Sequence, residues 1–267
     1  MAPASTGIHC WLRAEEDAPM SSTLDNPVWW ALAGPQQALG TSTSLAARFD
    51  PEVAPFGAFS DAPTQSHWED MARLVGSGGL VVPMEIPDAR LRPPPGWTVM
   101  REIPCVQMLG YHLEQRSGAS ARPRSRRKDR ANDDPVSLGD DDVDDMLELV
   151  ALAQPGPFLS RTVEFGGYVG IRREGRLVAM AGERLRPPGF AEVSAVATHP
   201  DHRRQGLAEQ LIRAVADSIM QRGEAPFLHA SASNSNAIRL YESMGFTLRR
   251  TLSFVVIRFA GRALNPS

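Results

Sequence analysis

The chain has 267 residues, of which 42% are apolar and 22% charged, and its formal net charge is −3. This length suits one large domain or two small ones, and the apolar content is enough for an ordinary globular core. The small acidic excess argues against a protein held on nucleic acid by charge, which needs a strong basic excess. The two cysteines, Cys10 and Cys105, form neither a metal-binding spacing nor a disulfide framework, so no metal site is expected.

Residues 1–22 are expected to be a flexible N-terminal segment, within which Met20 is an alternative start. Glu15, Glu16 and Asp17 stand where a secretory signal would be apolar. No apolar run reaches the roughly 18 residues that span a bilayer. We therefore expect a cytoplasmic protein without a membrane partner, of unknown oligomeric state.

Residues 23–116 are expected to form an N-terminal α/β accessory domain. Pro27 stands just inside a helix predicted over 26–39, a favoured place for proline. A second helix is predicted over 66–75, followed by strands over 80–84 and 97–109. The stretch Arg73 to Gly78 fits Arg-x-x-Gly-x-Gly. Because a helix precedes it and a strand follows, it predicts a helix end rather than a phosphate-binding turn.

Residues 117–135 are expected to be a flexible linker, because they hold almost no apolar side chains. The linker is rich in arginine, and an acidic run over 140–145 balances that charge. A solvated connector is therefore favoured over a docking site for an acidic partner.

Residues 136–262 have the pattern of a compact α/β domain. The sequence predicts a helix over 140–152, a hairpin of strands 168–173 and 176–186 around Glu174-Gly175, and a strand over 190–198. A helix then runs to about Arg222, where Gly223 ends it. A strand over 227–230, a helix over 235–244 and a last pair of strands within 246–259 follow.

The most informative segment joins the strand over 190–198 to the long helix through the turn Arg203-Arg204-Gln205-Gly206-Leu207-Ala208. Unpaired backbone N–H groups and the positive end of the macrodipole meet at a helix start, so a phosphate group binds there favourably. Gly206 has no side chain to block that approach. About 30 residues later comes a second motif, Asn234-Ser235-Asn236-Ala237-Ile238-Arg239-Leu240-Tyr241-Glu242-Ser243-Met244-Gly245-Phe246.

In this order, the two motifs resemble the pyrophosphate-binding turn Arg/Gln-x-x-Gly-x-Gly/Ala and the Asn-x-x-Ala-x-x-x-Tyr-x-x-x-Gly-Phe pattern of the GNAT acetyltransferase superfamily. The second is set tighter here, as Asn236-Ala237 ahead of Tyr241. The resemblance covers roughly residues 136–260 and is nearest to the glycine N-acyltransferase-like branch. It implies an α/β fold with a mixed, mostly antiparallel sheet flanked by helices. A degenerate GNAT-like fold for the N-terminal domain stays open.

The resemblance implies an N-acetyltransferase that moves an acyl group, usually acetyl, from acetyl-CoA to a primary amine by direct attack in a ternary complex. The acceptor, a small-molecule or peptide amine, and the acyl-chain length stay open. The alternative is a coenzyme A-binding sensor or scaffold module that does not turn over its ligand. Neither a nucleic acid partner nor a metal is implied.

By the same resemblance, the strand before the turn pairs with the pantetheine arm, and the N–H of Val196 polarises the thioester carbonyl. Asn236 reaches the pantetheine amides, or instead caps the helix that follows. The implied cofactor-binding set is Val196, Ala197, Thr198, Arg203, Arg204, Gln205, Gly206, Leu207, Ala208, Asn236, Ala237 and Tyr241.

Two side chains are predicted to move protons. Tyr241 stands where many family members place the acid that protonates the departing thiolate; a core tyrosine with its hydroxyl at the rim is the alternative. By the resemblance, Glu192 is the candidate general base, because it lies eleven residues before Arg203, the offset at which some GNAT members carry a catalytic glutamate. Strand alternation puts Glu192, Ser194 and Val196 on one face, so the carboxylate would point towards the thioester. That role requires burial to raise its pKa, and a contact with the substrate ammonium is the alternative.

Other polar residues in this half are weaker candidates. Glu183 and Arg184 are predicted to line the acceptor pocket. His199 and His202 are expected to be solvated loop histidines, and His229 a satisfied core histidine. None of these histidines has a metal-ligand spacing.

Overall fold

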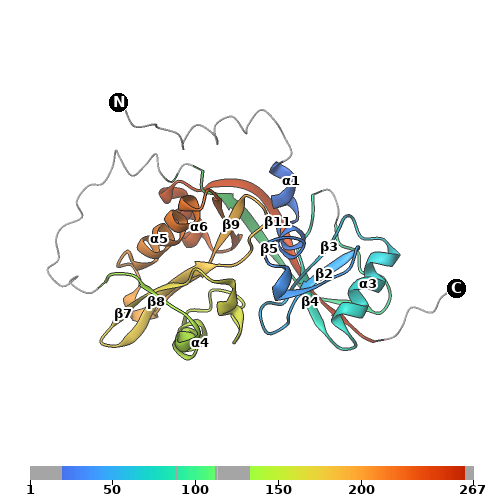
Figure 1. The fold of residues 1–267 in the computed structure, drawn as a ribbon, viewed down its shortest axis with the longest axis horizontal. Helices are drawn as coiled ribbons and strands as arrows, with labels where there is room; N and C mark the ends of the chain where they lie inside the picture. The colour runs from blue at the N-terminus through green and yellow to red at the C-terminus, as the bar shows by residue number, and fades with distance from the viewer. Residues whose placement is uncertain (1–19, 88–89, 112, 114–132, 262–267) are drawn as a thin grey trace.

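The computed structural model describes residues 20–87, 90–111, 113 and 133–261. In this part of the chain, eleven strands form one sheet with helices on both faces (Figure 1). The strand order is β1-β2-β3-β4-β11-β5-β10-β9-β8-β7-β6. The mixed, mostly antiparallel α/β fold that the sequence predicted is therefore confirmed.

The strands are β1 Gly40–Ser42, β2 Ala46–Phe49, β3 Phe56–Phe59, β4 Leu80–Pro83, β5 Trp97–Leu109, β6 Val136–Ser137, β7 Val169–Arg173, β8 Arg176–Glu183, β9 Phe190–Thr198, β10 Ala225–Ser231 and β11 Thr247–Phe259. The α-helices are α1 Met20–Asp25, α2 Pro27–Leu32, α3 Gln65–Val75, α4 Val143–Ala153, α5 Leu207–Gln221 and α6 Ser235–Met244. Short 3₁₀ turns are η1 Gln37–Leu39, η3 Asp140–Asp142, η4 Thr162–Phe165 and η5 Pro200–His202.

The two halves of the sheet repeat one arrangement. In the C-terminal half β8 and β9 are antiparallel, α5 follows, and β10 returns parallel to β9. In the N-terminal half β2 and β3 are antiparallel, α3 follows, and β4 returns parallel to β3. This order of elements is what a degenerate GNAT-like fold in the N-terminal half predicts.

The halves exchange their last strands. β5, which follows β4 in the chain, lies beside β10, and β11, which follows β10, lies beside β4. β5 and β11 pair with each other from Trp97–Phe259 to Leu109–Thr247. The sheet therefore runs without a break across the predicted domain boundary, which itself stays a prediction. The predicted N-terminal segment and linker lie mostly outside the described residues.

Apolar side chains cover both faces of the sheet. Leu211, Ile212 and Val215 of α5 pack with Met108 of β5 in one buried cluster, while Met146 of α4 belongs to a cluster on the opposite face. Figure 1 shows α5 and α6 on one side of β8 and β9, and α4 on the other. No helix in the described ranges is both long and apolar enough to cross a membrane.

Two of the expected elements were wrong. The helix predicted over 26–39 ends at Leu32, because Gly34-Pro35 follows and cannot continue it. The pair of strands predicted within 246–259 is the single strand β11, whose register shifts near Leu248 and Val256 bend it without ending it. β2 and β3 have no counterpart among the predicted elements. In contrast, Gly76 does end α3, as predicted for the Arg73–Gly78 stretch.

Candidate active site

The turn after β9 has the geometry of an anion-binding site. Arg204 and Gly206 adopt positive φ angles of 61° and 85°, and α5 begins directly after Gly206. The first backbone bond of the helix runs from Gln210 N to Gly206 O, so the preceding amides have no helical partner. A Cβ built on Gly206 would meet open space. Backbone N–H groups here can converge on a phosphate.

A salt bridge between Arg173 and Asp133 supports this turn. No pattern in the sequence indicated it. Arg173, at the end of β7, donates from Nη1 to Gln205 Oε1 at 2.7 Å and contacts His202 Nδ1 at 3.0 Å. Its other nitrogens bind both oxygens of Asp133 at 2.8 Å. Asp133 O in turn accepts from Gln210 of α5. This pair could not be expected from the sequence, because Asp133 lies in the predicted linker and Arg173 in the predicted hairpin, 40 residues further along the chain.

His199 and His202 were expected to be solvated loop histidines. His202 is only half-buried but accepts a bond from Arg173, so it belongs to the brace. His199 caps η5, accepting from Asp201 N at 3.3 Å. The two imidazole rings lie edge to face with their centroids 5.6 Å apart, and His199 Nδ1 lies 3.8 Å from Asp201 Oδ2.

An open strand edge lies beside the turn. β9 and β10 pair in parallel only as far as Glu192 and Phe227, although β9 continues to Thr198 and β10 to Ser231. β10 stays paired with β5 through Ser231. The β10-facing edge of β9 over Val193–Thr198 thus has no strand partner in the described part of the chain. An extended ligand with amide groups can pair with such an edge.

The alternation predicted for β9 is wrong beyond Ser194. Ala195 has a φ of 51°, and the register with β8 shifts between Met180–Ala197 and Gly182–Ser194. This bulge adds one residue and reverses the facing of those that follow. Val196 therefore packs with the α5-side cluster, on the opposite face from Glu192. A sequence pattern of alternating small residues carries no signal for such a bulge.

The structure brings several predicted residues together on the α5 side. Val196, Leu207, Ala208, Ala237 and Tyr241 all pack in or against one cluster. Tyr241 is 8% exposed and its ring contacts Phe246, with centroids 5.9 Å apart. Burial raises the pKa of Tyr241 to about 12, so the phenol stays protonated at neutral pH.

Asn236 does not cap α6. The cap is Asn234, whose side chain accepts from Ala237 N at 3.2 Å. Asn236 lies in the first turn, exposed, and accepts from Arg239 at 2.5 Å. Its side chain is therefore available at the surface. The remaining members of the predicted cofactor set surround the turn, with Arg203 and Arg204 exposed and Ala197 and Thr198 at the end of β9.

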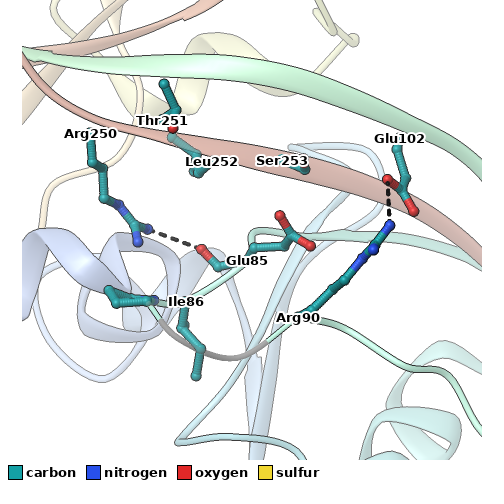
Figure 2. A pocket seen from close by; sticks show the side chains of 9 residues that line it. Glu85, Ile86, Arg90, Glu102, Arg250, Thr251, Leu252 and Ser253 are labelled. Atoms are coloured by element: carbon teal, nitrogen blue, oxygen red, sulfur yellow. Dashed lines mark hydrogen bonds and ion pairs between the residues drawn. The ribbon is translucent and has the colours of Figure 1, made fainter.

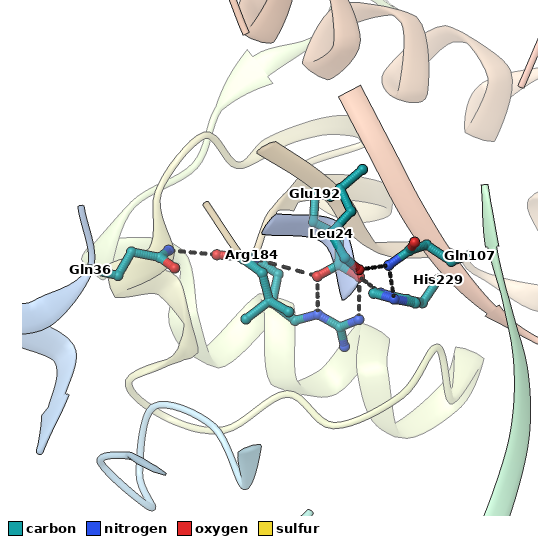
Figure 3. A network of polar contacts seen from close by, with 7 residues as sticks. Leu24, Gln36, Gln107, Arg184, Glu192 and His229 are labelled. Atoms are coloured by element: carbon teal, nitrogen blue, oxygen red, sulfur yellow. Dashed lines mark hydrogen bonds and ion pairs between the residues drawn. The ribbon is translucent and has the colours of Figure 1, made fainter. Parts of the chain in front are cut away.

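Glu192 is the centre of a buried cluster of charges (Figure 3). Its side chain is fully buried and receives two bonds from Arg184, Nε to Oε2 at 2.9 Å and Nη2 to Oε1 at 2.5 Å. His229 Nδ1 lies 2.7 Å from Oε1. Burial alone would raise the pKa of Glu192, but the positive charge of Arg184 and the hydrogen bonds from Arg184 and His229 outweigh it and lower the pKa to about 2.

Gln107 of β5 fixes the protonation of His229. Its Oε1 accepts from Arg249, so its Nε2 is the donor to Leu24 O at 2.9 Å and to His229 Nε2 at 3.1 Å. His229 Nε2 must then accept, which leaves the proton on Nδ1, facing Glu192. Burial, the largest cause, lowers the pKa of His229 and favours this neutral form. The expectation of a satisfied core histidine is confirmed.

Residues of the N-terminal half contact the cluster around Glu192 and help to fix it. Gln36 Nε2 donates to Arg184 O at 2.6 Å, and the Arg184 guanidinium lies 4.8 Å from the ring centroid of Phe56. Leu24 accepts from Gln107, as described. The neighbouring Glu183 instead binds Arg222 at 2.7 Å, at the end of α5 away from the turn. Glu183 and Arg184 are therefore both engaged in ion pairs.

Residues 168–255 match the family model described as FR47-like protein. A solved structure from Novosphingobium aromaticivorans, assigned to the GNAT family of acetyltransferases, is 39% identical. The alignment covers 88% of this chain and 97% of that protein's chain, with a TM-score of 0.73. A GCN5-related N-acetyltransferase from Kribbella flavida covers 93% and 98% at 15% identity, with a TM-score of 0.55, and is similar in fold.

Among curated proteins, the chain is similar to the [ribosomal protein bS18]-alanine N-acetyltransferase of Escherichia coli. The two are 46% identical over 59 residues, which is 21% of this chain and 40% of that protein. The chain thus spans less than half the length of this curated relative.

The Glu192 cluster predicts a specific dependence of stability on pH. Glu192→Gln leaves Arg184 buried without its carboxylate, so the free energy of unfolding at pH 7 should fall by about 3–5 kcal/mol. The native pKa of about 2 lies below the ordinary 4.5. The stabilisation is therefore complete above pH 4.5 and is lost as the pH falls towards 2.

Urea unfolding at a series of pH values checks this. The difference between wild type and Glu192→Gln should narrow below pH 4.5, while Glu148→Gln, at a side chain 67% exposed, should match wild type within about 0.5 kcal/mol. A Glu192→Gln difference that is constant from pH 7 to pH 2 would contradict the ion-pair description.

Proposed function

This chain belongs to the GNAT family of acetyltransferases, and we propose that it transfers an acetyl group from acetyl-CoA to a primary amine. The observation that carries the proposal is the combination of the Gly206 turn with the open edge of β9. The Gly206 turn offers backbone amides that can bind a pyrophosphate. The open edge of β9 offers hydrogen-bond partners for the pantetheine amides. Both lie at the same end of β9, as one extended ligand requires.

In this proposal the backbone does most of the binding. The amides from Gln205 to Ala208 would hold the pyrophosphate, with Arg203 and Arg204 exposed beside it. Arg173 would act as a positioning residue, because it holds Gln205 and His202. The N–H of Val196, next to the bulge, would stabilise the oxyanion that develops on the thioester carbonyl. Attack by the amine would be direct, within a ternary complex, with positioning supplying much of the rate.

We propose that Tyr241 protonates the departing thiolate. Its pKa of about 12 keeps the proton available at neutral pH. It also packs in the cluster that contains Val196 and Leu207, beside the proposed thioester and the pyrophosphate turn.

The surroundings of Glu192 do not favour its predicted role as general base. Full burial, a pKa of about 2 and occupation of both oxygens by Arg184 and His229 count against direct proton transfer. We propose instead that Glu192 positions β8, β9 and β10 where the last two strands separate. The amine would then lose its proton to water.

The acceptor and the branch within the family are also proposals. The Escherichia coli relative is named for an alanine of a ribosomal protein, but the match covers too little of it to transfer that substrate. The same chemistry also accommodates a glycine N-acyltransferase-like placement and an acyl group longer than acetyl. An amine of a small molecule and an amine of a peptide fit it equally.

Blocking the turn tests the cofactor site. Gly206→Trp places a large side chain where the pyrophosphate would lie, so the Kd for acetyl-CoA should rise at least 100-fold. This corresponds to a loss of about 2.7 kcal/mol of binding free energy. Gly223→Trp is the matched control, because Gly223 has a similar φ of 76°, faces open space and follows the other end of α5. Calorimetric titration should find binding intact in the control. Equal affinities in both variants would reject the site.

Removing the Tyr241 hydroxyl tests the acid. Tyr241→Phe should lower kcat about 100-fold, within the usual range for a general acid, while the Kd for acetyl-CoA stays unchanged. Thiol release on an amine panel measures kcat, and calorimetry measures binding. Full activity in the variant would remove Tyr241 from the mechanism. Binding without thiol release by the wild type on every amine would favour the sensor alternative.

A further inference from the structure

A separate pocket of about 460 Å³ lies against β11 (Figure 2). This volume is in the usual range for small-molecule sites. Its wall combines part of β11 with the segment after β4 and one residue of β5. The polar side chains that line it are Glu85, Arg90, Glu102, Arg250, Thr251 and Ser253.

A bulge in β11 turns two consecutive arginines towards α1. The register with β5 shifts between Leu248 and Arg250. Arg249 binds the Asp25 carboxylate at 2.6 Å and Gln107 at 2.8 Å. Arg250 Nη2 reaches only main-chain oxygens, those of Asp25 and Glu85, both at 3.0 Å. The carboxylate of Asp25 is thus used by the first arginine.

The Arg250 cation has no carboxylate in ion-pair contact within the described residues. Its Nε is buried and without a hydrogen-bond partner. Burial lowers the pKa of Arg250, and the charge of Arg249 adds to this, whereas those of Asp25 and Glu85 oppose it. A ligand could instead reach Nη1, which makes no hydrogen bond among the described residues and is not one of the buried atoms.

Glu85 supplies the opposite charge. Its backbone N donates to Ser253 O at 3.0 Å, which fixes it against β11. No ion pair or hydrogen bond engages its carboxylate in the part of the chain described. Figure 2 shows that carboxylate lying between Arg250 and Arg90. Arg90 is itself paired with Glu102 at 3.8 Å. Two arginines and two glutamates make the pocket neutral as a whole, which disfavours a polyanion.

We propose that this pocket binds a small zwitterion of the α-amino acid class. Arg250 would hold the carboxylate, for which a guanidinium is the best-matched side chain. Glu85 would hold the ammonium, and the hydroxyl groups of Thr251 and Ser253 line the same wall. In an α-amino acid the carboxylate and the ammonium are attached to the same carbon. Arg250 and Glu85 carry the two complementary charges, line one pocket and form no ion pair with each other.

This site is distinct from the proposed acetyl-CoA site. In the strand order β11-β5-β10-β9, three spacings of about 4.8 Å separate the strand of Arg250 from the strand of Val196, or about 14 Å. Val196 also packs on the α5 side of the sheet, whereas Leu252 and Phe254, which follow Arg250 in β11, pack on the opposite face with His229. The pocket is therefore separate from the turn proposed to bind the pyrophosphate, and the inference does not depend on the proposed function.

Calorimetric titration of the full chain with each of the twenty standard amino acids tests the proposal. At least one should bind with a Kd below about 1 mM. Its methyl ester, which lacks the carboxylate, and its N-acetyl derivative, which lacks the ammonium, should each bind at least tenfold more weakly. No binding by any amino acid, or equal binding of the three forms, would overturn the proposal.

Single-residue variants test whether the amino acid binds in this pocket. Glu85→Gln and Arg250→Gln should each weaken binding at least tenfold, whereas Glu148→Gln and Arg176→Gln, at side chains 67% and 69% exposed, should not. Glu85→Gln keeps the backbone contacts of Arg250 and remains decisive if Arg250→Gln fails to fold. Gly206→Trp should bind the amino acid normally. Loss of amino acid binding in Gly206→Trp would place the ligand at the turn instead and refute the separate site.

Discussion

The ladder between β5 and β11 is the constraint on which the rest of the structure depends. These two strands, each of 13 residues, cross the molecule side by side and exchange places between its halves. Because β5 holds β10 along its length, β10 can leave β9 after Phe227 without losing its place in the sheet. The open edge of β9 is thus a consequence of how the N-terminal half contributes a strand to the C-terminal one.

The buried charges follow from the same arrangement. Gln107 on β5, His229 on β10 and Glu192 on β9 lie on neighbouring strands and form one chain of hydrogen bonds, which Arg184 and Arg249 end with positive charge. Such a network is costly to bury and strongly destabilising when half-broken. Contacts from Leu24 and Gln36 to its members make the N-terminal half part of its support.

Much of the fold could be predicted from local sequence, because glycine turns and amphipathic periods are local signals. β5, β9 and α6 were predicted with the bounds observed, and the Gly206 turn with its helix was identified from six residues. The bulge at Ala195 could not be predicted, since it depends on register with β8, and it moved Val196 away from Glu192. Ion pairs between distant residues, such as Arg173 with Asp133 and Arg184 with Glu192, also leave no local pattern. For that reason a predicted base proved to be the centre of a charge cluster with a lowered pKa.

A crystal structure of the chain with acetyl-CoA bound would show whether the Gly206 turn and the open edge of β9 hold one cofactor. We expect pyrophosphate oxygens within hydrogen-bond distance of the amides of Gly206, Leu207 and Ala208. We also expect pantetheine paired along Val196–Thr198, where β9 and β10 have separated. Acetyl-CoA bound anywhere else, or β10 closing onto that edge of β9 in its presence, would rule out this cofactor site.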